Sequence, residues 1–213
     1  MLKQKIKLYL LIKIIDLKFM EKKEDFKGFN KDEYVPILRD ESISFLYDLA
    51  KKLQPKKILE IGTYIGYSAS ILLSSSPNCT LDTVEIKEEN ANLARENLKN
   101  FGERAKVFCQ DAKDFIETKL KEKKKYDFIF LDGPKGQYIR YLPILKELLE
   151  SGGVLVADNV YFHGMVKMEG KIPHKHRSIV NNLRQFINEI SIDSNLQTTI
   201  YDIGDGISVS YKN

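Results

Sequence analysis

Short apolar runs alternate with amphipathic stretches along most of this chain, and their order predicts the elements of an α/β fold. Runs rich in Ile, Val, Leu and Phe are typical of buried strands, whereas apolar residues three or four positions apart are typical of helices. The pattern predicts strands at residues 58–61, 80–86, 105–109, 126–131, 154–157, 197–203 and 207–211. It predicts helices at residues 41–53, 67–74, 90–100, 112–120, 138–149 and 177–190.

Strands that alternate with helices favour right-handed crossovers and a parallel sheet covered by helices on both faces. The last two predicted strands are separated by Gly204-Asp205-Gly206, a typical hairpin turn, so one of them must run against its neighbours. The sequence therefore predicts a Rossmann-like α/β fold. Its sheet is seven-stranded and mostly parallel with one antiparallel strand, and helices cover both faces.

Length and composition fit one soluble, well-packed domain. The chain has 213 residues, 43% hydrophobic and 30% charged, which excludes a disordered protein. The net charge of +4 is compatible with an anionic partner. Cys79 and Cys109 are too few and too isolated for a disulfide framework or a zinc site, so a cytoplasmic location is expected. Both are expected to be small buried hydrophobic residues.

Residues 1–34 are predicted to form an N-terminal helical and basic extension before the predicted domain at residues 35–213. Their longest apolar run, Leu8 to Ile12, is too short for a signal-peptide core or a membrane span, so we expect no membrane partner. A basic amphipathic helix can also lie on RNA, but more often it packs on its own domain or pairs in a dimer. One helical face carries Leu8, Leu11, Ile12, Ile15 and Phe19.

Acidic side chains follow two predicted strands at the point where each strand ends. Asp132 comes directly after residues 126–131, and Asp158-Asn159 comes directly after residues 154–157. In an open α/β sheet the loops at the carboxyl ends of strands bind ligands. Two carboxylates and an amide oxygen there would suit a hard cation such as Mg²⁺. The alternative is that Asp132 caps a helix and Asp158-Asn159 forms a turn.

A glycine-containing loop follows the first predicted strand and opens a helix. Gly62 and Gly66 permit a tight turn and close approach of a ligand to the backbone. Glu85 ends the second strand, where a carboxylate can hydrogen-bond a ribose diol. These features predict an adenosine-containing cofactor. The glycine spacing differs from the dinucleotide fingerprint and Tyr64 lies within it, so the loop suits the amino-acid part of S-adenosylmethionine better than a pyrophosphate.

Asp111 and Ala112 follow the third predicted strand and would face the adenine of that cofactor. Asp111 also suits the N-cap of the following helix, and both roles can hold together.

From Val35 onward, these strings resemble the class I S-adenosylmethionine-dependent O-methyltransferases of the catechol and caffeoyl-CoA type. Residues 59–68 look like the first cofactor motif of that family. The family's three metal ligands are matched by Asp132, Asp158 and Asn159.

Within this family, three strings look most like the bacterial tRNA 5-hydroxyuridine methyltransferases, which make 5-methoxyuridine at the wobble position. These strings are residues 132–138, 158–160 and 204–207.

The resemblance implies roles for single residues. Lys135 matches the catalytic lysine, acting with Asp132, and would take the acceptor's proton or stabilise its anion. The alternative for Lys135 is an ordinary solvated surface lysine. The resemblance also implies a homodimer. The expected cofactor contacts are Ile37, Glu60, Gly62, Tyr64, Ser68, Glu85, Asp111, Ala112 and Asp132.

Two substrate classes fit the expected metal chemistry. A Mg²⁺ ion can chelate two neighbouring acceptor oxygens and favour the oxyanion. A catechol offers a second hydroxyl and 5-hydroxyuridine offers O4, so the metal site alone does not decide between them.

Basic residues after Asn159 favour RNA, because phosphate contacts need cations and a wobble base must leave its stack to react. Our leading hypothesis is methylation of 5-hydroxyuridine in tRNA, with the anticodon region as partner. The alternative is an O-methyltransferase of small catechol or caffeoyl-type phenols. A third interpretation, a non-catalytic RNA-binding module, is disfavoured by the intact metal ligands. The expected RNA contacts are Lys175, His176, Arg177 and Arg184.

Overall fold

The structure is a computed structural model that describes residues 22–29 and 39–213. The predicted amphipathic face between Leu8 and Phe19, and the expected cofactor contact Ile37, lie outside the described residues.

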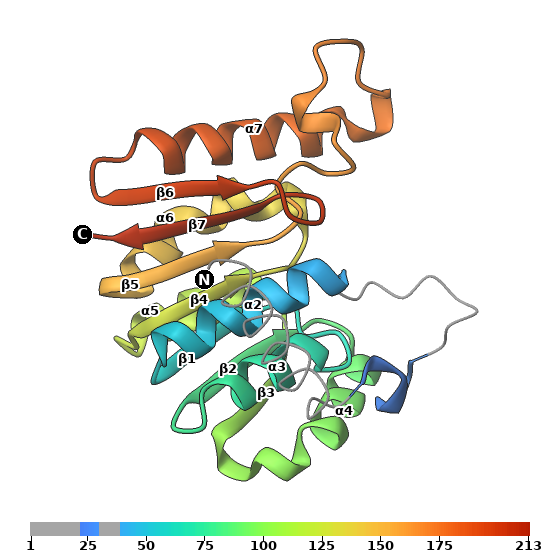
Figure 1. Ribbon diagram of the computed structural model, residues 1–213, viewed down its shortest axis with the longest axis vertical. Helices are drawn as coiled ribbons and strands as arrows, with labels where there is room; N and C mark the ends of the chain where they lie inside the picture. Colours follow the sequence, from blue (N-terminus) through green and yellow to red (C-terminus); the bar gives the residue numbers. More distant parts are fainter. Residues whose placement is uncertain (1–21, 30–38) are drawn as a thin grey trace, which may run out of the picture.

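Seven strands form one sheet in the order β3-β2-β1-β4-β5-β7-β6. The first five strands in this order are parallel, and β7 is antiparallel to both of its neighbours, which confirms the predicted sheet (Figure 1). The strands are β1 Lys57–Ile61, β2 Thr80–Glu85, β3 Ala105–Cys109, β4 Tyr126–Leu131, β5 Leu149–Ala157, β6 Leu196–Tyr201 and β7 Ile207–Lys212.

Helices cover both faces of the sheet, with α2 and α3 in front of it and α5 and α6 behind it (Figure 1). The α-helices are α2 Asp40–Leu53, α3 Tyr67–Ser75, α4 Glu88–Asn97, α5 Ala112–Lys121, α6 Tyr138–Leu148 and α7 Arg177–Ile192. Short 3-10 helices are η1 Lys23–Asp25, η2 Lys99–Arg104, η3 Lys135–Gln137, η4 Met165–Lys167 and η5 His174–His176.

Alternation along the strands creates two hydrophobic cores. In β4, Phe128 and Phe130 join the core beneath α2 and α3, whereas Ile129 and Leu131 join the core beneath α5, α6 and α7. Successive side chains of a strand point to opposite faces, so an all-apolar strand must be covered on both sides. The continuous apolar runs in the sequence have this physical cause.

The structure differs from the predicted elements mainly before the second half of β5. The predicted strand begins at residue 154, with Ser151-Gly152-Gly153 interpreted as a turn before it, but β5 begins at Leu149 and includes residues 151–153. The pairing is irregular there: Tyr126 of β4 pairs with Leu149, whereas Phe128 pairs with Val154. Extra residues are thus accommodated as a bulge, helped by Gly152 with φ of 77°.

Part of the chain before residue 35 packs on the domain. Phe26 is buried, and its ring meets the ring of Tyr67 edge-on at 5.0 Å. The boundary at residue 35 stays a prediction, although residues 22–29 contribute to the first core. Within the described ranges, no helix is long and apolar enough to cross a bilayer.

The two cysteines differ in environment. Cys79 is buried as expected, but the expectation for Cys109 was wrong, because it is exposed. Cys109 ends β3, which is an edge strand of the sheet and therefore lacks a neighbour on one side.

Candidate active site

Two of the predicted metal ligands, Asp132 and Asp158, lie at the carboxyl edge of the sheet because β4 and β5 are adjacent and parallel. Leu131 pairs with Ala157, so Asp132 and Asp158 occupy equivalent positions one residue beyond the two strand ends. Backbone hydrogen bonds continue past these ends, from the Asp132 N–H to the Ile61 carbonyl at 2.9 Å and from the Asp158 N–H to the Leu131 carbonyl at 3.2 Å. Both aspartates are therefore fixed to the sheet.

Asp158 is a buried carboxylate with incomplete hydrogen bonding. Its side chain is 1% exposed, and Oδ1 accepts one long hydrogen bond, 3.5 Å from Ser42 Oγ. Oδ2 is buried without a hydrogen-bond partner in the described part of the chain. Burial, reinforced by the charge of Asp132, raises the pKa of Asp158 to about 7. A buried polar atom without a partner is costly, so this oxygen is suited to a ligand that is not a protein group.

The donor set fits a hard divalent cation. Asn159 follows Asp158 with a left-handed backbone, φ of 54°, which asparagine tolerates better than most residues. No group of three His, Cys, Asp or Glu side chains that could hold a metal ion occurs among residues 22–29 and 39–213. The candidate set is instead two carboxylates and an amide, Asp132, Asp158 and Asn159, and oxygen ligands of this kind suit Mg²⁺.

Lys135 is not an ordinary surface lysine. It begins η3, is largely buried, and its Nζ lies 2.5 Å from Oδ1 of Asp132. Burial alone lowers the pKa of Lys135, but the Asp132 carboxylate and the Tyr138 hydroxyl outweigh it and hold that pKa above its ordinary value. Lys135 is therefore an ammonium in this arrangement and can stabilise an oxyanion. Accepting a proton from a substrate requires its ion pair with Asp132 to loosen.

Tyr138 supports both aspartate loops, a role that sequence reasoning missed. Its side chain is fully buried at the start of α6, and its hydroxyl lies 2.9 Å from the Leu131 carbonyl and 3.2 Å from the Asp158 carbonyl. It thereby ties together the ends of β4 and β5. A tyrosine at the start of an amphipathic helix is indistinguishable from core in the sequence, and no signal there marks this role.

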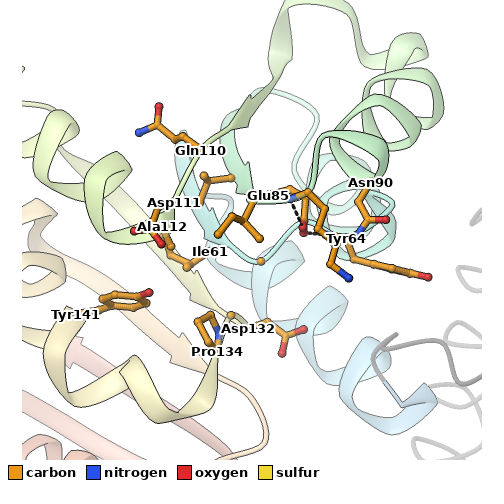
Figure 2. Close-up of a pocket in the computed structure, with 15 residues that line it drawn as sticks. Ile61, Tyr64, Glu85, Asn90, Gln110, Asp111, Ala112, Asp132, Pro134 and Tyr141 are labelled. Carbon is orange, nitrogen blue, oxygen red and sulfur yellow. Dashed lines mark hydrogen bonds between the residues drawn. The ribbon is translucent and has the colours of Figure 1, made fainter.

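A cavity of about 310 Å³ adjoins Asp132 and opens at the carboxyl ends of β1, β2 and β3 (Figure 2). Six of the expected cofactor contacts line it, namely Gly62, Tyr64, Glu85, Asp111, Ala112 and Asp132. Sequence reasoning missed several others, including Ile86, Asn90, Gln110 and Tyr141. In Figure 2, Asp132 and Pro134 lie at the opposite end of the cavity from Gln110 and Asn90.

Carboxylates at this cavity have local partners. Glu85 Oε2 accepts the Tyr64 N–H at 3.0 Å, drawn as a dashed line in Figure 2, and Oε1 accepts the Lys87 N–H at 2.9 Å. Glu85 thus holds the glycine loop in place. Asp111 caps α5 by accepting the N–H groups of Lys113 and Asp114, which confirms the alternative role as N-cap. Both carboxylates nevertheless border the cavity.

Gly62 allows two loops to cross in close contact. Its φ is 101°, and a Cβ there would lie 2.6 Å from the carbonyl oxygen of Asp132. A side chain is excluded by both conformation and space. The glycine loop therefore depends on the same backbone that carries the first predicted metal ligand.

Glu60 and Ser68 do not line the cavity but lie beneath it. Glu60 is fully buried, accepts a hydrogen bond from Thr83 Oγ1 at 2.5 Å, and is also hydrogen-bonded by Ser68. Thr83 in turn shares a short hydroxyl contact with Thr63 of the glycine loop. Burial raises the pKa of Glu60 to about 7, and its Oε1 lacks a partner in the ranges that the structure covers.

Most of the expected RNA contacts are occupied in holding the segment between Asn159 and α7. Arg177 Nε donates to the Ile172 carbonyl at 3.2 Å. Arg184 donates to the Val166 and Met168 carbonyls at 3.0 and 2.6 Å. The His176 ring meets the Phe162 ring edge-on, and Lys175 is exposed on η5. RNA contact at these residues stays a prediction.

Comparison with known proteins gives consistent matches over nearly the whole chain. The sequence model of the O-methyltransferase family matches residues 18–213. The chain is 30% identical over 175 residues to caffeoyl-CoA O-methyltransferase of Medicago sativa, covering 78% of this chain and 70% of that protein.

Solved structures agree with this match. A Staphylococcus aureus protein provisionally assigned as a caffeoyl-CoA O-methyltransferase superposes with a TM-score of 0.83 and 28% identity, covering 97% of this chain and 99% of that one. The O-methyltransferase of Bacillus cereus, solved in complex with SAH, gives a TM-score of 0.77 and 26% identity, covering 85% of each chain. The chain therefore belongs to the O-methyltransferase family.

Proposed function

We propose that this protein is an S-adenosylmethionine-dependent, divalent-cation-dependent O-methyltransferase whose acceptor is a small catechol or caffeoyl-type phenol with two adjacent oxygens. One observation carries the proposal: Asp158 has a buried oxygen without a partner among the described residues and lies within reach of the charge of Asp132, which lines the cavity. Membership of the O-methyltransferase family supports the reaction. Similarity to the caffeoyl-CoA O-methyltransferase of Medicago sativa supports the substrate class.

The cavity along β1, β2 and β3 is the proposed cofactor site. S-adenosylmethionine is proposed because the Bacillus cereus relative holds SAH, its demethylated product. Glu85 lies where it can accept hydrogen bonds from the ribose diol. Ile86 and Tyr141 offer apolar surface to the adenine. The methionine part would lie over the glycine loop, towards Asp132.

Methyl transfer to oxygen is an in-line displacement, so the protein contributes chiefly by positioning the reactants. When bound at Asp132, Asp158 and Asn159, a divalent cation supplies Lewis acidity that favours the deprotonated acceptor. Lys135 provides a positive charge beside the acceptor oxygen. Its largely buried position keeps that charge poorly screened, which strengthens its effect on a nascent oxyanion.

Methylation of 5-hydroxyuridine in tRNA is the second candidate function. Exposed cations on the segment beyond Asn159, Lys171 and Lys175 among them, favour it, because phosphate contacts require such charges near the metal site. Arg177 and Arg184 contribute less to this candidate, since they already donate to backbone carbonyls.

One set of assays separates the two functions. Purified protein is given S-adenosylmethionine and Mg²⁺ with either caffeoyl-type catechols or tRNA containing 5-hydroxyuridine, at low and high salt. Turnover of the catechol that persists at high salt supports the proposal of a small phenolic acceptor. Transfer only to tRNA, weakening steeply with salt, supports the second candidate. Full activity in the presence of a chelator would contradict the metal site in both.

A further inference from the structure

The turn between β6 and β7, residues 203–206, makes an unusual set of contacts with the segment that follows the predicted metal ligands. The Asp205 carboxylate accepts the His163 N–H at 2.5 Å and the Gly164 N–H at 3.2 Å. The backbone joins in, because the Asp205 carbonyl accepts the Tyr161 N–H at 2.9 Å and the Gly206 carbonyl accepts the Val160 N–H at 3.0 Å. Four hydrogen bonds thus fix residues 160–164.

The backbone of this segment adopts unfavourable conformations that need support from neighbouring residues. Asn159, Phe162 and His163 have φ values of 54°, 48° and 56°. Positive φ is unfavourable for residues with a Cβ, particularly for a bulky one such as Phe162. The surroundings must therefore impose the conformation, and Asp205 satisfies two N–H groups at the point of greatest distortion. At 8% exposure, its carboxylate is shielded from water, which strengthens these bonds.

The same turn also packs against the other side of the ligand pair. A Cβ on Gly206 would lie 2.4 Å from the Tyr161 ring, and one on Gly204 would lie 2.5 Å from Ser42 Oγ. Ser42 is the residue that contacts Asp158. The turn therefore supports Asp158 through Ser42 and supports Asn159 through the segment after it.

We propose that Asp205 is a positioning residue for the metal and acceptor site, holding Asn159 and the wall at residues 160–164 in the geometry that the ligand requires. The inference rests on the proposed metal function, which assigns Asp158 and Asn159 as ligands. Among the described residues, the hydrogen bonds of the Asp205 carboxylate go to the backbone and not to these side chains, although its charge also acts on Asp158. Supporting residues of this kind typically change metal affinity by about 10- to 100-fold.

The test compares Asp205→Ala and Asp205→Asn with the wild type and with Asp202→Asn. Asp202 leads into the same turn and is highly exposed, and its carboxylate interacts with Lys167 and with the Tyr161 side chain. The control therefore removes a nearby negative charge but leaves the four hydrogen bonds of the clamp in place. Three quantities are measured on the full chain: Mn²⁺ affinity, S-adenosylmethionine affinity, and hydrogen exchange of the His163 and Gly164 amides.

We expect Asp205→Ala to raise the Kd for Mn²⁺ about 10- to 100-fold and to accelerate exchange of both amides at least about tenfold, with cofactor affinity within about twofold of wild type. Asp205→Asn retains one acceptor oxygen and should give smaller changes of the same kind. Asp202→Asn should match the wild type. Retained cofactor binding shows that a variant is folded, and the near-isosteric Asp205→Asn remains available if Asp205→Ala does not fold.

Outcomes for the two proposals are distinct. Wild-type protein that binds no Mn²⁺ would overturn the proposed metal function itself. Wild-type binding together with unchanged Mn²⁺ affinity in both Asp205 variants would overturn only the positioning role. Equal losses in Asp202→Asn and Asp205→Asn would also overturn it, because charge rather than the clamp would then be responsible.

Discussion

The two ends of the active site differ in how their carboxylates are hydrogen-bonded. At the cofactor end, the cavity along β1, β2 and β3, Glu85 and Asp111 accept backbone N–H groups from their own loops. At the acceptor end, formed by Asp132, Lys135, Asp158 and Asn159, an oxygen of Asp158 has no partner among the described residues. Glu85 and Asp111 are thus paired within the protein, whereas Asp158 keeps a buried oxygen available to the proposed cation.

This difference predicts that a substitution at one end of the active site should leave ligand affinity at the other end unchanged. Asp158→Ala should produce the largest effect, lowering kcat/KM by at least about 10³-fold, because both acceptor orientation and oxyanion stabilisation are lost. Isothermal titration should still give a cofactor Kd within a few-fold of wild type. Loss of cofactor binding in a folded variant would show that the two ends are not separate.

Lys135→Met should lower kcat by about 10²-fold, since a single charge that stabilises the anion is removed. Metal affinity should stay the same or increase, because the ammonium that pairs with Asp132 is gone. Single-turnover kinetics together with Mn²⁺ titration measure the two quantities. A large fall in metal affinity would mean that Lys135 organises the ligands instead of acting on the acceptor.

Glu60 lies beneath the cofactor end, and its protonation should make the free energy of unfolding depend on pH. Its pKa is raised from 4.5 to about 7, so the folded state retains a proton that the unfolded state loses, and the wild-type free energy of unfolding falls across that range. Glu60→Gln removes this loss and should be more stable than wild type by about 3 kcal/mol at pH 8, with little difference at pH 4. Denaturant titrations over this range test the prediction. An unchanged difference at all pH values would contradict the buried, protonated state of Glu60.

Glu85→Ala should have the smallest effect. It removes the proposed ribose contact and frees the Tyr64 and Lys87 N–H groups, so we expect the cofactor Kd to rise about tenfold, equivalent to about 1.4 kcal/mol. Mn²⁺ affinity should not change. The matched control Glu89→Ala alters an exposed residue on the neighbouring helix and should leave both affinities as in wild type.

The fold was predictable because its strands are buried on both faces and are bounded by recognisable turns. Strands at residues 105–109 and 126–131 were predicted with the observed bounds. Residues 151–153 were not, since Gly152-Gly153 indicates a turn equally well whether or not the chain continues into the sheet. The bulge arises from how β5 pairs with β4, so the local sequence does not specify it.

The site was predictable where a residue's position at a strand end defines its environment. Asp132, Asp158, Glu85 and Asp111 all follow or end strands, and the sheet brings them to one edge. Tyr138 and Asp205 were missed because their roles come from contacts between distant segments. For Arg177 and Arg184, the RNA contact expected from their charge stays a prediction, and the structure adds that each also donates to a backbone carbonyl, which the sequence did not indicate.

Asp132 leaves the strand at the border between the two ends of the site, with the cavity on one side and Asp158 on the other. The half of the molecule that recognises the methyl donor can therefore stay constant while residues 159–176 and the last hairpin diversify. Such a division lets one scaffold acquire new acceptors through changes in a few loops, without redesign of the donor pocket. Substrate range in proteins built this way should accordingly vary with those loops.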